Sequence, residues 1–133
     1  MKSTGGILNP QLSRVIAETG HTDLLVITDA GLPIPQNVER VDLSIVPNLP
    51  HFLDVLRAVA SELVIEGIIL AEEIKSFSPD MEKAILQLFP KDIPVQYMPH
   101  TQFKETTKFA RAAIRSGEFT SYANVILQAG VAY

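Results

Sequence analysis

The run Leu24-Leu25-Val26-Ile27-Thr28 constrains the fold more than any other stretch of the chain. Its apolar residues leave no polar face, so a strand here must be buried on both sides, as strands of parallel sheets are. A second apolar run, Ile65 to Ala71, repeats the pattern, and segments with helical spacing lie between such runs. Strands that alternate with helices predict an α/β fold. We expect a single domain over residues 1–133, with a Rossmann-like, largely parallel sheet flanked by helices.

Caps, chain breakers and periodicity predict the other elements. Asn9-Pro10 is a typical helix start and Gly20 a typical helix stop, so a helix is expected between them. The charged segment that follows the second apolar run contains Glu72, Glu73 and Lys75 and is interpreted as a solvated strand end. The remaining predictions are a half-buried strand over 41–45, a helix over 52–63, a helix that starts at Ser78-Pro79 and ends at Pro90, a strand over 94–98, a helix with Phe103, Thr107, Ala110 and Ile114 on its inner face and a stop at Gly117, and a last strand over 124–127.

Composition excludes several classes of function. The chain has no cysteine, which rules out disulfides, thiol catalysis and thiolate metal sites. A net charge of −4 provides no electrostatic footprint for nucleic acid or an anionic membrane. The N-terminus lacks the apolar run of a signal peptide, and the absence of cysteine suits a reducing cytoplasm. The positive mean hydropathy and the apolar end from Val125 to Tyr133 favour a homo-oligomer over a monomer.

Two candidate functional residues flank the first strand. His21 precedes it, and Asp29 follows its C-terminal end, which is where ligands bind in open α/β sheets. Histidine exchanges protons near neutral pH, so His21 paired with Asp29 would serve proton transfer without a cofactor. The structural alternative is that His21 bonds a helix-end carbonyl and that Asp29 only begins a turn.

Other polar residues extend this set. His100 leaves a later strand, whereas His51 starts a helix and is interpreted as a solvated first-turn residue. Tyr122 and Asn124 point to the same side of an extended segment, so both can reach one ligand; alternatively they are a buried tyrosine and a turn asparagine. The histidines share no metal-ligand spacing, and the chain lacks GxGxxG, P-loop and GxSxG motifs. The sequence therefore predicts no metal and no cofactor.

Several segments, in one order and spacing, resemble the D-ribose pyranase family, which belongs with the fucose mutarotases. These segments, together with the single histidine at 100, are GILNPQL near the start, GHTD at 20–23, DAGLPIP at 29–35, VDLSIVPNLPHF at 41–52, AEEIK at 71–75 and IRSGEFTSYANVILQAGV at 114–131. The resemblance implies a cytoplasmic enzyme that interconverts the pyranose and furanose forms of D-ribose. It also implies a decamer of two stacked pentameric rings, with sugar clefts between neighbouring subunits.

The resemblance also assigns roles to residues. It implies that His21 is the proton donor, and that the sugar contacts are Asp29, His100, Tyr122, Ala123 and Asn124. Fucose mutarotases are less similar, because they typically carry DAHFP where this chain has DAGLP at 29–33. A mutarotase for fucose or another monosaccharide and a non-catalytic sugar-binding regulatory module remain the alternatives.

Overall fold

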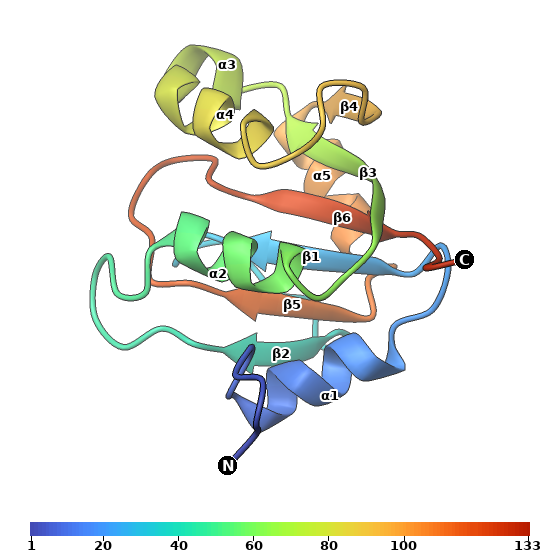
Figure 1. The fold of residues 1–133 in the computed structure, drawn as a ribbon. Coiled ribbons are helices and arrows are strands. Elements are labelled where there is room, and N and C mark those ends of the chain that lie inside the picture. The colour runs from blue at the N-terminus through green and yellow to red at the C-terminus, as the bar shows by residue number, and fades with distance from the viewer.

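A computed structural model describes the whole chain, residues 1–133 (Figure 1). Its helices and strands follow one another as α1 (Pro10–Glu18), β1 (Leu24–Thr28), β2 (Glu39–Asp42), α2 (Phe52–Ala60), β3 (Ile65–Ala71), α3 (Ile74–Phe77), α4 (Pro79–Leu86), β4 (Val95–Met98), α5 (His100–Thr107), β5 (Ala112–Arg115) and β6 (Val125–Ala129). The strands form one six-stranded sheet in the order β2-β5-β1-β6-β3-β4. Only β6 runs antiparallel to its neighbours. The predicted α/β fold with a largely parallel sheet is confirmed.

Two apolar cores sandwich the sheet. Successive residues of β1 point to opposite faces, so Leu25 and Ile27 join one core while Val26 joins the other. The first core packs under α1, α2, α3 and α4, and Phe52 of α2 is fully buried there. The second core is covered by α5 and the 32–38 loop, and Phe103 is its largest side chain. In Figure 1, α2 lies in front of the sheet and α5 behind it. Both central apolar runs are therefore covered on both faces.

The strand β5 corrects the predicted helix that was to continue to Gly117. The helix α5 ends at Thr107, and Ala112 to Arg115 pair in parallel with both β1 and β2. Alanines favour helices, and their spacing after Phe103 extended the helical pattern. Residues 112–115 form a strand instead of a helix because they lie between β1 and β2. A strand in this position satisfies the backbone hydrogen-bonding groups of both neighbours.

Smaller differences concern the element ends. The predicted strand over 41–45 is shifted to Glu39–Asp42, because the chain then turns and the Ile45 N–H bonds the Leu49 carbonyl. Ser78 does precede α4, but its hydroxyl donates to the Ser121 carbonyl at 2.7 Å instead of capping the helix. The short helix α3 was not predicted. No helix has the length and apolar character needed to cross a membrane.

Candidate active site

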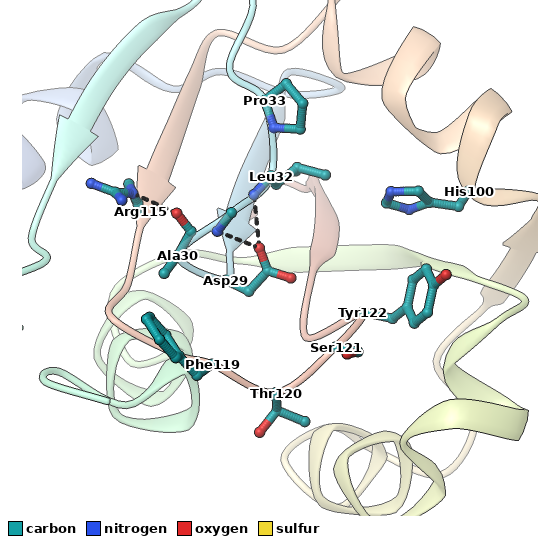
Figure 2. A pocket seen from close by; sticks show the side chains of 11 residues that line it. Asp29, Ala30, Leu32, Pro33, His100, Arg115, Phe119, Thr120, Ser121 and Tyr122 are labelled. Atoms are coloured by element: carbon teal, nitrogen blue, oxygen red, sulfur yellow. Dashed lines mark hydrogen bonds between the residues drawn. The ribbon is translucent and has the colours of Figure 1, made fainter. Parts of the chain in front are cut away.

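The C-terminal ends of the parallel strands and the start of β6 surround a pocket of about 580 Å³ (Figure 2). That volume lies in the usual range for small-molecule sites. Residues after β1, at the end of β5, after β4 and before β6 contribute to it, because all these chain ends meet at one edge of the sheet. The pocket is lined by Asp29, Ala30, Gly31, Leu32, Pro33, His100, Arg115, Phe119, Thr120, Ser121 and Tyr122.

Asp29 is held rigidly on this pocket's floor. Its Oδ1 accepts hydrogen bonds from the Gly31 and Leu32 N–H groups at 2.9 and 2.8 Å, which closes a tight turn. Its Oδ2 accepts one bond from the Asn124 side chain at 3.1 Å and points toward the space between His100 and Tyr122 (Figure 2). A carboxylate oxygen can accept more than one hydrogen bond, so Oδ2 can also bind a ligand hydroxyl.

Asn124 and Ala123 do not line the pocket. Asn124 is 1% exposed, and both of its polar atoms bind Asp29: Oδ1 accepts from the Asp29 N–H at 2.8 Å, and Nδ2 donates to the carboxylate. Ala123 is fully buried in the core. Asn124 is thus placed to act on a ligand through Asp29, and Ala123 packs beneath the site.

His100 and Tyr122 form an aromatic wall. The two rings meet edge to face with centroids 5.1 Å apart, and the His100 ring stacks on Phe103 at 6.2 Å. Tyr122 adopts a left-handed backbone conformation (φ 61°), which costs a non-glycine residue about 1 kcal/mol or more. Such strain is typical of residues whose side-chain direction matters for function.

Two further residues organise the pocket and were not singled out from the sequence. The Arg115 Nε donates to the Ala30 carbonyl at 3.0 Å, and its Nη1 donates to Asp42 at 3.0 Å. The Glu118 carboxylate is buried and accepts hydrogen bonds from the Phe52 N–H at 3.0 Å and from the Thr120 hydroxyl at 2.7 Å. The sequence gives little indication of these roles. Apart from the bond between Glu118 and Thr120, each contact joins residues that are 66 or more positions apart.

His21 lies elsewhere, which corrects the predicted pairing of His21 with Asp29 within one chain. The two residues flank β1, whose five residues at about 3.3 Å each separate them by roughly 17 Å. His21 instead contacts Glu66 at the start of β3, with 3.0 Å between Nε2 and Oε2, and its side chain is 50% exposed. The exposed His21 therefore lies at the N-terminal end of β1, and the pocket lies at the C-terminal end of the same strand.

The contribution of Glu118 to the stability of the fold depends on pH. Burial alone would raise the pKa of Glu118, but hydrogen bonds from Thr120, the Phe52 N–H and His51 outweigh it and hold that pKa below the ordinary value. A lowered pKa in the folded state stabilises the fold above the unfolded pKa, and this stability is lost as the pH falls through the folded pKa. We expect Glu118→Gln to lower the free energy of unfolding by about 1–3 kcal/mol at pH 7.

The matched control for this prediction is Glu105→Gln, which removes the same charge from an exposed position beside Lys108. Denaturant unfolding should show little change for this control. The deficit of Glu118→Gln should shrink as the pH falls below the unfolded glutamate pKa of about 4.3 and then through the lower folded pKa, where the wild-type carboxyl becomes protonated as well. An unchanged deficit between neutral and acidic pH would contradict the proposed cause.

Comparisons with known proteins agree with this arrangement. Residues 1–132 match the model of the RbsD / FucU transport protein family. The chain belongs to this family. It is 53% identical to the D-ribose pyranase of Geobacillus kaustophilus, over 96% of this chain and 93% of that protein. It is 48% identical to the D-ribose pyranase of Bacillus subtilis, over 96% of this chain and 97% of that protein.

Solved structures of the RbsD / FucU family show the same fold. The Bacillus subtilis RbsD complexed with D-ribose superposes with a TM-score of 0.95 at 47% identity, and the match covers both chains completely. FucU of Bifidobacterium longum superposes with a TM-score of 0.80 at 26% identity, over 95% of this chain and 97% of that one. The whole chain, including the pocket segments, thus has counterparts in family members. No three metal-binding side chains of the types His, Cys, Asp or Glu gather anywhere in the chain.

Proposed function

We propose that this protein is a D-ribose pyranase, an isomerase that interconverts the pyranose and furanose forms of D-ribose. The observation that carries the proposal is the pocket around Asp29, His100 and Tyr122, in a chain whose similar family members are named D-ribose pyranase. The full-length likeness to an RbsD complexed with D-ribose supports the choice of sugar. Fucose mutarotases share the fold at a much lower identity, which favours ribose over fucose.

The reaction needs only proton transfers. Opening the pyranose breaks the bond between C1 and the ring oxygen; the anomeric hydroxyl loses a proton and the ring oxygen gains one. Closure to the furanose adds the C4 hydroxyl to the free aldehyde and reverses these transfers. An acid and a base positioned on the sugar suffice, so the proposal requires neither metal nor cofactor. We assign His21 as the proton donor, and Asp29, His100 and Tyr122 as direct sugar contacts. Asn124 supports Asp29 through two hydrogen bonds, and Ala123 packs in the core between Tyr122 and Asn124.

This assignment requires a second subunit, because His21 and Asp29 of one chain lie at opposite edges of its sheet. We propose that the His21 edge of one subunit closes the pocket of its neighbour. An exposed apolar side chain in the pocket lining supports such a contact, because Phe119 is 67% exposed. Ring-shaped assembly by this repeated head-to-tail contact is consistent with the decamer of two pentameric rings implied by the family resemblance.

The assembly is tested by size-exclusion chromatography with light scattering, run beside the activity assay. We expect an oligomer whose dissociation on dilution abolishes activity, because isolated subunits have incomplete sites. A monomer with full ribose exchange would contradict the shared site and leave only single-chain chemistry. We place the enzyme in the cytoplasm, working beside ribose uptake.

NMR saturation transfer on D-ribose tests the function itself. At a protein concentration far below that of the sugar, an isomerase makes exchange between pyranose and furanose signals visible. A non-catalytic sugar-binding module would only broaden lines in proportion to its own concentration. The same experiment on L-fucose separates the pyranase from the fucose mutarotase.

A further inference from the structure

The His100 imidazole lines the pocket and carries a buried polar atom that finds no hydrogen-bond partner in the chain. Neither ring nitrogen makes a hydrogen bond, and Nδ1 is buried away from water. An unsatisfied buried polar atom costs about 1–3 kcal/mol, so native proteins rarely keep one without a reason. The far edge of the ring, which carries Nε2, projects from the start of α5 into the pocket toward Asp29 (Figure 2). The two nitrogens therefore have different environments: Nδ1 is enclosed, and Nε2 faces the ligand space.

The enclosed Nδ1 limits the protonation states of the ring. An imidazolium carries N–H groups on both nitrogens, and its Nδ1–H would be buried with no acceptor. The backbone position adds to this cost, because His100 is the first residue of α5 and the N-terminus of a helix disfavours positive charge. Of the two neutral forms, the one with the proton on Nε2 keeps the N–H group where an acceptor can reach it.

Three charged groups, on α5 and after β3 and β1, act on this ring. Burial, followed by Lys104 one turn along α5, lowers the pKa of His100; Glu73 after β3 and Asp29 after β1 raise it, but do not outweigh the lowering. Tyr122, before β6, meets the His100 ring in an edge-to-face contact. Arg115 is engaged by Asp42 elsewhere on the pocket wall.

The backbone of His100 is fixed by Glu73. Both carboxylate oxygens of Glu73 accept from the His100 N–H, at 3.0 and 3.1 Å. This contact corrects the interpretation of Glu73 as a merely solvated strand end. It holds the first turn of α5 in place, and the stacking on Phe103 fixes the plane of the ring. A rigid ring can direct a single N–H at a ligand atom.

We propose that His100 is a neutral imidazole with its proton on Nε2, which donates a hydrogen bond to a sugar hydroxyl and neither gains nor loses a proton during the reaction. This role rests on the proposed function. Asp29 only accepts hydrogen bonds, so one hydroxyl placed between the two residues donates to Asp29 and accepts from His100. The proton transfers of ring opening are then left to the other groups of the site, and His100 orients and polarises the sugar.

The protonation state is tested without substrate, by two-bond ¹⁵N–¹H NMR on protein labelled in its histidines. The chain has three histidines, so His21→Gln and His51→Gln identify the His100 signals by elimination. We expect the Nε2–H pattern and a titration midpoint below the ordinary histidine value of about 6.5. Lys104→Gln should move the midpoint up and Glu73→Gln should move it down. An Nδ1–H pattern, or a midpoint at or above the ordinary value, would overturn the proposal.

The activity arm compares His100→Gln with His100→Leu in ribose exchange. Glutamine retains an amide N–H donor at similar reach, whereas leucine keeps the bulk and cannot donate. We expect leucine to lose about ten- to a hundredfold and glutamine to lose clearly less, since leucine removes the hydrogen bond and glutamine keeps a donor for it. Equal losses of about 10²–10⁴ in both variants would indicate proton transfer by His100 and refute the proposal. If wild type itself shows no ribose exchange, the proposed function fails while the NMR result still decides the state of His100.

Discussion

His21→Ala should fold normally and lose ribose ring interconversion by about 10²–10⁴-fold, the range typical of a lost general acid or base. The expected fold is normal because the side chain is half exposed and its one hydrogen bond in the chain goes to Glu66. The expected loss is large because no other proton donor of the neighbouring subunit is assigned to the pocket. Saturation transfer on D-ribose gives the rate, and circular dichroism with thermal unfolding checks the fold.

A second exposed histidine supplies the matched control. His51 is 60% exposed just before α2 and does not line the pocket; its Nδ1 lies 3.4 Å from the Glu118 Oε1. We expect His51→Ala to exchange ribose at close to the wild-type rate. Near-wild-type exchange in a folded His21→Ala protein would remove His21 from the mechanism, whatever the control shows.

Asp29→Asn should weaken both sugar binding and turnover, with a loss of exchange that also reaches about 10²–10⁴-fold. The substitution keeps the shape of the side chain but removes the negative charge that faces the sugar. It also has a structural side effect, because the new amide group can face the Asn124 amide across the 3.1 Å contact, donor against donor. A single variant thus mixes a lost charge with a damaged hydrogen bond.

The double variant Asp29→Asn with Asn124→Asp separates these two effects. Exchanging the two side chains restores a donor–acceptor pair between them while the carboxylate stays away from the pocket lining. We expect the double variant to recover stability in denaturant unfolding and to stay inactive on ribose. Wild-type binding and exchange in Asp29→Asn itself would show that another carboxylate serves the reaction.

The sequence predicts those parts of the fold that depend on local patterns. Most residues of the strands Leu24–Thr28 and Ile65–Ala71 are buried, so their apolar runs indicate both position and length. The start of α1 follows from its cap, and the Asn9 side chain does accept from the Leu12 N–H at 2.8 Å. Local patterns do not predict the strand β5. Ala112 and Ala113 favour a helix, but pairing with both β1 and β2 overrides this preference.

The pocket was only partly predictable, for a related reason. Asp29 and His100 follow strands, and ligands bind where parallel strands end, so their neighbourhood is implied by the fold class. The parts played by Arg115, Glu118 and Glu73 depend on contacts between distant segments, which no local pattern reports. The position of His21 relative to the pocket depends on the length of β1 and on the direction in which the chain enters the sheet.

Mixing two inactive variants tests most directly the claim that His21 and Asp29 from different subunits form one ribose-converting site. His21→Ala and Asp29→Asn subunits are co-expressed or exchanged, and native mass spectrometry verifies that mixed oligomers form. Random assortment in a ring leaves about one quarter of the sites with both residues intact, so ribose exchange should rise from near zero to about a quarter of the wild-type rate. Mixed oligomers that stay as inactive as each parent variant would contradict the shared site.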